Sequence, residues 1–276
     1  MKPFNKAAII GVGLIGGSVA LAMKRKRLAK KIVGVSRHKK SISTAKRLGA
    51  IDEGSLSLGI IRGADLVVLS LPVKTIINLA PKISRIVAKD CLITDAGSTK
   101  KEIVTHLDKI FTNFIGSHPL AGSEKRGVVN AEAGLFEDSL CILTPTLKTS
   151  RLAKEKAKAL WSELGVKTVF LSADKHDKIL SFSSHLAHAV AFSLISSVPD
   201  KDLRFSSNGL KDTTRLASSD SCLWRDIFLS NQKNMLQALT VFEQKLKDLK
   251  EAIRKKDAKK LKSILKQAKI KRDSLS

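Results

Sequence analysis

The chain has 276 residues, enough for one large domain or two ordinary ones with proper cores, and we expect two. Its three cysteines, Cys91, Cys141 and Cys222, are odd in number and widely spaced. This pattern supports neither a disulfide framework nor a zinc site, and it predicts a reducing, cytoplasmic setting. No apolar run approaches the ~20 residues that cross a bilayer, so we expect no membrane partner.

The formal net charge of +25 suggests a nucleic-acid partner, because clustered Lys and Arg side chains bind phosphate without regard to sequence. The lysines are instead spread over nearly every expected helix, and the chain has no Tyr. Its Phe and Trp residues do not alternate with basic residues as stacking platforms would. We interpret the charge as solvated helix faces and expect no nucleic acid, although a positive field would attract anionic substrates and cofactors.

A glycine turn follows the first expected strand, residues 7–10, and precedes a stretch with helical periodicity, residues 17–23. Gly11 would allow the tight turn, Gly13 would let the backbone approach a pyrophosphate, and Gly16 would let the helix pack closely on the strand. The helix N-terminus would present unpaired N–H groups and a positive dipole end to the phosphates. The turn therefore predicts dinucleotide binding by Gly11, Gly13, Leu14, Ile15 and Gly16.

The next expected strand, residues 31–35, ends where such a fold usually places an acid that binds the adenine ribose. Ser36 and Arg37 stand there instead, followed by a histidine and two lysines. A hydroxyl with a cluster of positive groups suits the 2′-phosphate of NADP better than a free ribose hydroxyl. The sequence therefore favours NADP, with NAD as the alternative, unless this is only a basic loop on a basic protein.

Strands and helices alternate from there to residue 171. Further strands are expected at 64–72, 91–95, 113–116, 139–145 and 166–171, and helices at 41–48, 75–87 and 149–164, with a short helix before residue 113. Ligands of open α/β sheets bind at the carboxyl ends of the strands. This rule places Ser70, Leu71 and Pro72 beside the cofactor and Ser98 at the same edge. His118, at a strand end beside Pro and Gly, is not expected to be a core histidine.

Beyond residue 173 the pattern is helical, with helices expected at 174–197, 221–255 and 257–271. The fold class is therefore α/β: a Rossmann-type doubly wound sheet over residues 1–171, followed by an all-α dimerisation domain over residues 172–276. The first of these helices is apolar over most of its surface, which places it in an interior or a subunit interface. We expect a homodimer, the commonest symmetric assembly.

Ser184, His185 and His188 interrupt the apolar centre of that first helix, and the two histidines lie one turn apart. No Cys, Asp or Glu stands near them in sequence to complete a metal site, so we expect no metal. We interpret them as polar groups that line a cleft for a small-molecule substrate between the two domains.

Six motifs occur in order along the chain: GVGLIGGS from residue 11, TDAGSTK from 94, GSHPLAG from 116, SHLAH from 184, KDTTR from 211 and WRD from 224. Together they resemble the prephenate and arogenate dehydrogenases of tyrosine biosynthesis over essentially the whole chain. The resemblance implies oxidative decarboxylation of prephenate to 4-hydroxyphenylpyruvate, with hydride transfer from ring C4 to a nicotinamide. Arogenate, which would give tyrosine directly, is the alternative substrate.

The resemblance also implies roles for single residues. His118 would be the catalytic histidine on the substrate's ring hydroxyl, supported by Ser98, and Arg215 would bind a substrate carboxylate. The other substrate-binding residues would be Ser184, His185, His188, Asp212 and Trp224, with Trp224 reaching the partner's cleft. Two residues depart from the family pattern: Ser36 replaces the acid expected for NAD, and Ala187 stands where Pro is frequent.

Two further classes remain open. A non-catalytic NADP-binding sensor or a nucleic-acid partner is favoured by the charge and disfavoured by the polar pocket residues. A β-hydroxyacid dehydrogenase of similar architecture would need a catalytic lysine on the first long helix after the sheet. The positions that face the same way as His185 and His188 offer none.

Overall fold

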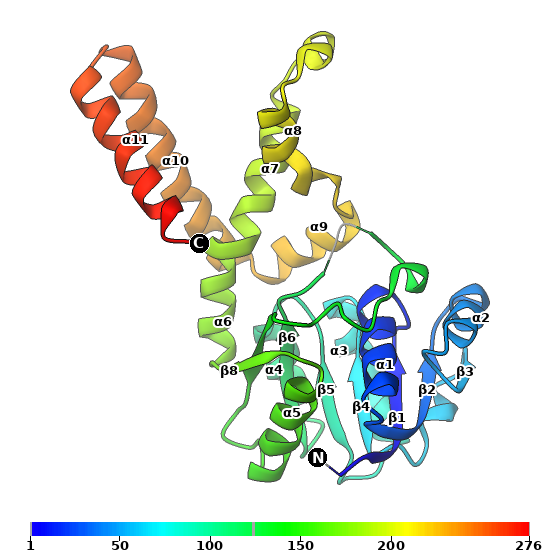
Figure 1. Ribbon diagram of the computed structural model, residues 1–276. Helices are drawn as coiled ribbons and strands as arrows, with labels where there is room; N and C mark the ends of the chain where they lie inside the picture. The colour runs from blue at the N-terminus through cyan, green and yellow to red at the C-terminus, as the bar shows by residue number, and fades with distance from the viewer. Residues whose placement is uncertain (1, 123–124, 276) are drawn as a thin grey trace. The chain divides into compact units, whose positions relative to one another are not determined.

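The computed structural model describes residues 2–122 and 125–275 (Figure 1). Contacts within the chain divide it into two compact units, residues 1–231 and residues 232–276. The first unit contains one eight-stranded sheet and the helices around it. The second unit contains two helices. Each unit is described by itself.

The sheet of the first unit has the strand order β3-β2-β1-β4-β5-β6-β7-β8. Its strands are β1 (Phe4–Ile10), β2 (Ala29–Val35), β3 (Glu53–Ser55), β4 (Leu66–Leu69), β5 (Leu92–Asp95), β6 (Phe114–Pro119), β7 (Leu140–Thr144) and β8 (Lys167–Phe170). Neighbouring strands are parallel except for the antiparallel pair β6 and β7. Strands β4 and β5 are buried along their whole length, which explains their apolar sequences.

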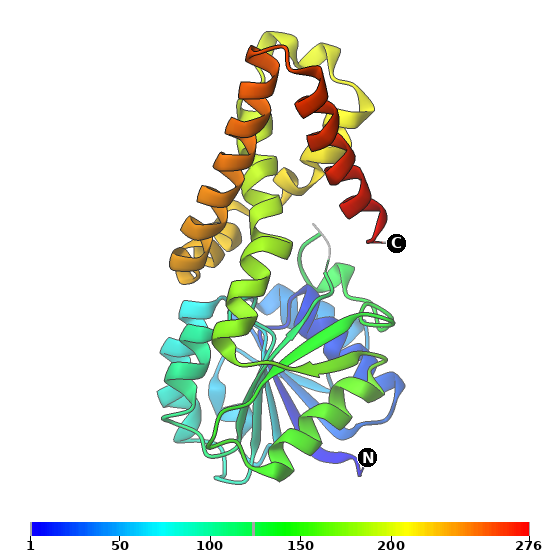
Figure 2. The same ribbon diagram turned by 90° about the vertical axis from the view of Figure 1, so that its left-hand side faces the viewer.

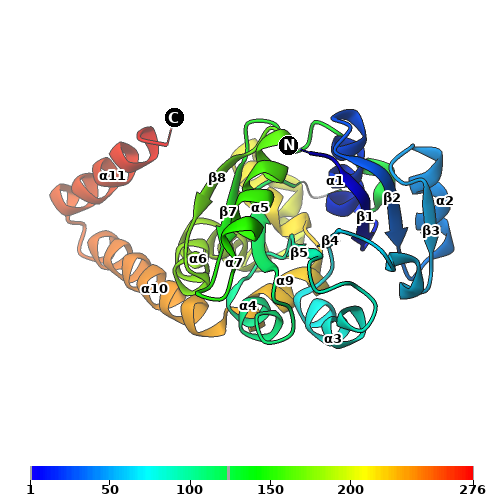
Figure 3. The same cartoon turned by 90° about the horizontal axis from the view of Figure 1, so that it is seen from below.

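Helices cover both faces of this sheet, as the doubly wound fold requires (Figure 3). The helices of this part are α1 (Leu14–Arg25), α2 (Lys39–Arg47), α3 (Val73–Ser84), α4 (Lys101–Leu107) and α5 (Arg151–Glu163). Residues of α1, α2 and α5 share one buried cluster with the sheet, and residues of α3 and α4 share the other. The predicted fold class is confirmed. Strand β3 was not predicted, because it is a three-residue strand at the sheet edge without apolar alternation.

The remaining helices of the first unit follow β8. They are α6 (Ala173–Leu180), a π-helical turn (Ser181–His185), α7 (Leu186–Ser196), α8 (Asn208–Thr214) and α9 (Ser221–Ser230), with 3₁₀ segments at Asp200–Phe205 and Arg215–Ser218. From α6 to α7 the chain forms one continuous helix (Figure 2). This is the one helix among residues 2–122 and 125–275 that is long and apolar enough to cross a membrane, and 22% of its most apolar window is buried. Of the two positions predicted for this helix, an interior or a subunit interface, the exposed remainder favours the interface.

The helix predicted over residues 221–255 is wrong in one respect, because the structure breaks it at Asn231. There the backbone leaves the helical region, with φ −116° and ψ 28°. The buried Asn231 side chain donates from Nδ2 to the carbonyl oxygen of Asp177 at 2.8 Å. This tertiary hydrogen bond stabilises a break that helical periodicity could not reveal.

The second unit is a hairpin of α10 (Gln232–Arg254) and α11 (Ala258–Asp273), which run in opposite directions (Figure 1). Lys256, with φ 49°, lies in the turn, and the Asp257 side chain caps α11 by accepting from the Lys260 N–H at 2.9 Å. Both helices carry exposed apolar side chains, among them Leu246 and Leu265. The division between the units at Asn231 lies well beyond residue 171, because α6 and α9 contact α4 and α3.

Candidate active site

A pocket of about 830 Å³ lies over the carboxyl ends of the central strands. It is bordered by the start of α1, by the segments that follow β4, β5 and β6, and by the helical stretch after β8. The predicted residues among its lining are Gly13, Leu14, Ile15, Ser70, Leu71, Pro72, Ser98, His118, Ser184, His185, His188, Arg215 and Trp224. Residues far apart in sequence, from both predicted domains, thus meet around one space.

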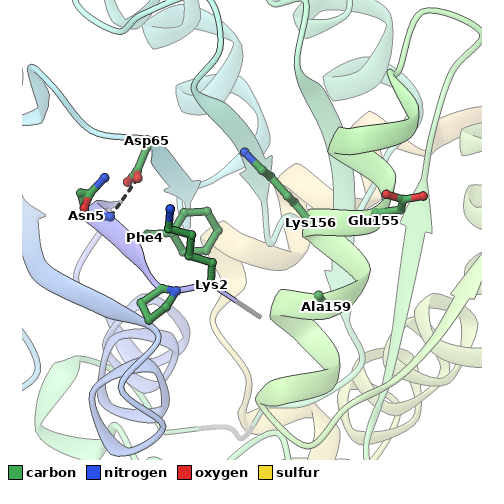
Figure 4. Close-up of a pocket in the computed structure, with 8 residues that line it drawn as sticks. Lys2, Phe4, Asn5, Asp65, Glu155, Lys156 and Ala159 are labelled. Carbon is green, nitrogen blue, oxygen red and sulfur yellow. Dashed lines mark hydrogen bonds between the residues drawn. The ribbon is translucent and has the colours of Figure 1, made fainter.

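A second pocket of about 400 Å³ lies where β1 begins, beside α5 (Figure 4). One of its two carboxylates, Asp65, accepts from the backbone N–H groups of Asn5 at 2.8 Å and Lys6 at 3.0 Å. That side chain therefore ties β1 to the segment before β4. The pocket lies at the amino ends of these strands, opposite to the edge where α/β sheets bind ligands, and we do not assign it a catalytic function.

The glycine turn has the space that a dinucleotide needs. Gly11 has φ +99°, and a Cβ atom there would lie 2.1 Å from the carbonyl oxygen of Ser70. A Cβ on Gly16 would lie 2.2 Å from the Gly11 carbonyl oxygen, so this position holds α1 against the turn. A Cβ on Gly13 would meet nothing within 4 Å. The backbone at Gly13 is therefore open toward the pocket, and a pyrophosphate fits beside the first turn of α1.

Side-chain hydrogen bonds from Asp95 and Lys100 hold the end of β6, which carries His118, against the end of β5. Backbone pairing between β5 and β6 ends at Thr94 and Ile115. Beyond it, Asp95 accepts from the backbone N–H groups of Ser117 at 3.2 Å and Gly97 at 2.8 Å. Asp95 also forms an ion pair with Lys100, whose Nζ donates to the Ser117 carbonyl oxygen at 2.8 Å. Both side chains of the ion pair are fully buried, so this edge of the pocket is rigidly held.

His118 is partly buried, and its ring lines the pocket. Burial lowers the pKa of His118 well below its ordinary value, and the nearby His176, Lys100 and His185 lower it further. The imidazole is therefore neutral at neutral pH and able to accept a proton. Ser98 lines the same pocket. The predicted support of His118 by Ser98 stays a prediction, since the described hydrogen bond of the His118 ring runs to His176.

His176 and Asp177 were missed by the sequence analysis. His118 Nδ1 lies 2.9 Å from His176 Nε2, and His176 Nδ1 lies 2.7 Å from Asp177 Oδ1. Both residues are buried in α6. The available signal was an adjacent His-Asp pair near the start of a helix that follows a strand. This pair lies outside the apolar centre of the helix, so the pattern that indicates His185 and His188 does not indicate it.

The two histidines of the apolar helix have different surroundings. His185 is 1% exposed, and its Nδ1 lies 3.2 Å from Asn231 Nδ2. His188 is stacked on Trp224 with ring centroids 3.4 Å apart and an interplanar angle of 22°. Burial lowers the pKa of each histidine to about 4. The π-helical turn ends at His185 and has one residue more than an ordinary helical turn, as is frequent at functional sites. Ser184, from the same turn, lines the pocket.

Trp224 lines the pocket of its own chain. Its side chain is 8% exposed and lies against His188 and Phe228. Aromatic stacking, which sequence spacing does not show, holds the indole there. Its reach into the cleft of a partner stays a prediction.

Five predicted site residues lie outside the pocket lining: Gly11 and Gly16 of the glycine turn, and Ser36, Arg37 and Asp212. Asp212 is exposed on α8, whereas Arg215 begins the 3₁₀ segment that follows α8 and lines the pocket. Both residues belong to the KDTTR motif and were predicted to bind substrate. The α-helix changes to a 3₁₀ helix between them, and only Arg215 lines the pocket. Ser36 and Arg37 follow β2, where the Ser36 Oγ accepts from the His38 N–H at 3.2 Å and the Arg37 side chain is exposed.

Among the described residues, no group of three or more His, Cys, Asp or Glu could hold a metal ion.

Family models match both halves of the chain. The model of the prephenate dehydrogenase nucleotide-binding domain matches residues 19–170. The model of the prephenate dehydrogenase dimerization domain matches residues 172–267.

Curated relatives and solved structures agree with these matches. A prephenate dehydrogenase of Bacillus subtilis (strain 168) is 35% identical, over 97% of this chain and 75% of the relative. A cyclohexadienyl dehydrogenase of Zymomonas mobilis is 36% identical, over 93% and 91%. The crystal structure of prephenate dehydrogenase from A. aeolicus, in complex with hydroxyphenyl propionate and NAD+, gives a TM-score of 0.93 at 40% identity, over 99% of this chain and 98% of that chain. The chain therefore belongs to the prephenate dehydrogenase family.

Proposed function

We propose that this protein catalyses the oxidative decarboxylation of prephenate to 4-hydroxyphenylpyruvate in tyrosine biosynthesis. The observation that carries the proposal is a neutral histidine, His118, in one pocket with the open glycine turn and Arg215. A bound nicotinamide cofactor would accept the hydride from ring C4. The ring carboxylate would then leave as carbon dioxide, which makes the ring aromatic.

The chain's own residues bind the substrate and move one proton. His118 accepts the proton of the ring hydroxyl at Nε2, and Ser98 supports it from the segment that follows β5. Arg215 binds a substrate carboxylate through a charge-assisted pair. Ser184, His185, His188 and Trp224 form the wall of the pocket and exclude water from the ring. The cofactor binds along the turn at Gly13 and the segment from Ser70 to Pro72.

Arogenate dehydrogenation is the second candidate, because the carboxylates of two described residues line the pocket and could meet the ammonium group of arogenate. They are Asp220 and Asp226. Asp220 is paired with Arg126 at 2.5 Å, and Asp226 with Arg225 at 2.8 Å. Because each carboxylate is already paired with an arginine, it attracts the ammonium group of arogenate less strongly. The pairs therefore favour prephenate, a keto acid without an ammonium group, over arogenate. The arogenate dehydrogenase of Synechocystis shares the fold with a TM-score of 0.84 at 28% identity, over 98% of this chain and all 100% of that chain.

NADP is the preferred cofactor in this proposal. Ser36 and Arg37 follow β2, and α2 begins at Lys39, so the end of this strand presents a hydroxyl and several positive charges. The 2′-phosphate of NADP would pair with Arg37, whereas an acid at Ser36 would repel it. The A. aeolicus relative was crystallised with NAD+, so the preference has to be measured for this chain.

The protein acts as a soluble, cytoplasmic homodimer in this proposal, with the helical part as the dimer interface. We also propose that the boundary between its sheet domain and its helical domain lies at residue 171; the family-model matches over residues 19–170 and 172–267 support this.

One experiment tests the function. Prephenate and arogenate are each offered with NAD and NADP, and reduced nicotinamide is followed by absorbance. Turnover of prephenate supports the proposal, and no turnover with any pair favours a non-catalytic sensor.

A further inference from the structure

Three side chains form a hydrogen-bonded row behind the pocket. His118 Nδ1 lies 2.9 Å from His176 Nε2, and His176 Nδ1 lies 2.7 Å from Asp177 Oδ1. The row begins at the pocket wall and ends at a carboxylate that is 1% exposed. It joins the end of β6 to α6.

The backbone of α4 holds the Asp177 carboxylate in place. Its Oδ1 accepts from the Lys100 N–H at 2.7 Å, and its Oδ2 accepts from the Lys101 N–H at 2.9 Å. Each of the two carboxylate oxygens thus accepts a hydrogen bond from a backbone N–H. A carboxylate can only accept hydrogen bonds, so the hydrogen between Asp177 and His176 must be on His176 Nδ1.

The tautomers of both histidines follow from that carboxylate. Burial lowers the pKa of His176, so its ring is neutral at neutral pH and its Nε2 has a lone pair. His176 Nε2 must therefore accept, and His118 Nδ1 must donate. A neutral His118 with its hydrogen on Nδ1 has its lone pair on Nε2, the atom that the proposed reaction requires as the base.

We propose that His176 and Asp177 are positioning residues that fix the base tautomer of His118 and receive its second proton during the reaction. As the substrate's ring hydroxyl gives its proton to His118 Nε2, the hydrogen on His118 Nδ1 moves to His176 Nε2. His118 is then neutral again, and the positive charge rests on His176, in contact with the Asp177 carboxylate. This inference rests on the proposed function of His118.

The surrounding charges favour this final position of the proton. The titratable or charged groups that face the two rings are Asp177 and His185 from the helix 173–196, Lys100 from the start of α4 and Asp95 from the end of β5. Lys100 opposes a positive charge on either ring. Asp177 contacts only His176 of the two, so an imidazolium is better stabilised there than at His118.

The variant His176→Gln separates the two proposed roles of His176, which are to fix the tautomer of His118 and to receive its proton. A glutamine carbonyl can still accept from His118 Nδ1, but it cannot take up the proton. We expect kcat to fall roughly 10-fold with little change in KM, and the acidic limb of the pH profile to move to lower pH. The variant His176→Leu also removes the acceptor, so we expect a larger loss, up to about 10⁴-fold, as seen when a catalytic histidine loses its tautomer. His106→Gln, on the exposed face of α4, is the matched control and should keep wild-type kinetics.

A nuclear magnetic resonance measurement tests the tautomers without turnover. In the full-length protein labelled with ¹⁵N-histidine, we expect protonated Nδ1 and bare Nε2 for both His118 and His176, assigned with His118→Asn and His176→Gln. A hydrogen on Nε2 of His118, or a His176→Gln variant with the wild-type kcat and pH profile, overturns the relay. If no substrate is turned over but the tautomers are as stated, the proposed function fails and the hydrogen-bonded row stands.

Discussion

Asp95 and Lys100 form an ion pair with both side chains fully buried, directly under the strand end that carries His118. The pair is fixed by hydrogen bonds from Gly97 and Ser117 to Asp95 and from Lys100 to the Ser117 carbonyl oxygen. Such a pair stabilises the fold only while both partners are present, because a single buried charge is strongly unfavourable.

We therefore expect Lys100→Met to lower the free energy of unfolding by about 3 to 5 kcal/mol. The double variant Asp95→Asn/Lys100→Met should recover part of that loss, since no unpaired charge remains. Lys101→Met is the matched control, because the Lys101 side chain pairs with Asp174 in an exposed position and should contribute little. Urea unfolding measures all three, and an equal loss from Lys100→Met and Lys101→Met would contradict the argument.

The kinetic roles of His118 and Arg215 should differ. His118 acts in the transition state, so His118→Asn should lower kcat by about 10²- to 10⁴-fold with little change in KM. Arg215 meets a charge that the substrate already carries, so Arg215→Ala should mainly raise KM, in line with a loss of roughly 2 to 5 kcal/mol. Steady-state kinetics with prephenate decide this. If the two variants exchange these signatures, the assignment of base and anchor is wrong.

The acidic limb of the pH profile should lie at unusually low pH. Burial holds the pKa of His118 well below its ordinary value of 6.5, so the base form persists as the pH falls below that value. We expect kcat/KM to decline only at more acidic pH, with an apparent pKa that belongs to the His118 and His176 pair. This limb should be absent in His118→Asn. A limb centred near 6.5 would show that His118 is more solvated than the structure indicates.

The glycine turn and His118 could be predicted because their signals are local. A strand, three glycines and a helix are contiguous in sequence, and His118 stands beside Pro and Gly at a strand end. The row from His118 through His176 to Asp177 could not be predicted, because it depends on a tertiary contact between the end of β6 and α6. The helix break at Asn231 depends likewise on a hydrogen bond to Asp177, 54 positions earlier in the chain.

Protonation of His185 should destabilise the fold at acidic pH. Its pKa is lowered from 6.5 to about 4 by burial, so the unfolded chain binds this proton more tightly than the folded one. Stability from this group is present above pH 6.5 and is lost as the pH falls toward 4. We expect a loss of about 2 kcal/mol from His185 alone between pH 7.5 and pH 5. The dependence, followed by urea unfolding, should be shallower in His185→Gln, although other buried histidines will keep part of it.

The loop after β2 should decide the choice of cofactor. Arg37→Ala removes a charge-assisted contact to the 2′-phosphate, so kcat/KM with NADP should fall by about 10- to 100-fold while the value with NAD changes little. Ser36→Asp should act in the same direction by repulsion and should favour NAD. Lys2→Ala, at the opposite edge of the sheet, is the control for a general loss of positive charge. A wild-type preference for NAD that Arg37→Ala leaves unchanged would show that the loop is only a solvated surface.

The exposed apolar side chains of the helical part predict the dimer interface. The helices of residues 232–276 form a two-helix unit, and several of its large apolar residues stay exposed within one chain. Leu246 is 54% and Leu265 is 56% exposed. Two helices alone cannot bury such surface, so we expect it to be covered by a second copy of the chain. Leu246→Glu should therefore shift the protein from dimer to monomer in sedimentation velocity at micromolar concentration. Leu147→Glu, a matched change at a fully exposed residue before α5, should leave the dimer intact. A wild-type chain that sediments as a fully active monomer would contradict the dimer, and it would show that the pocket of a single chain is sufficient for the reaction.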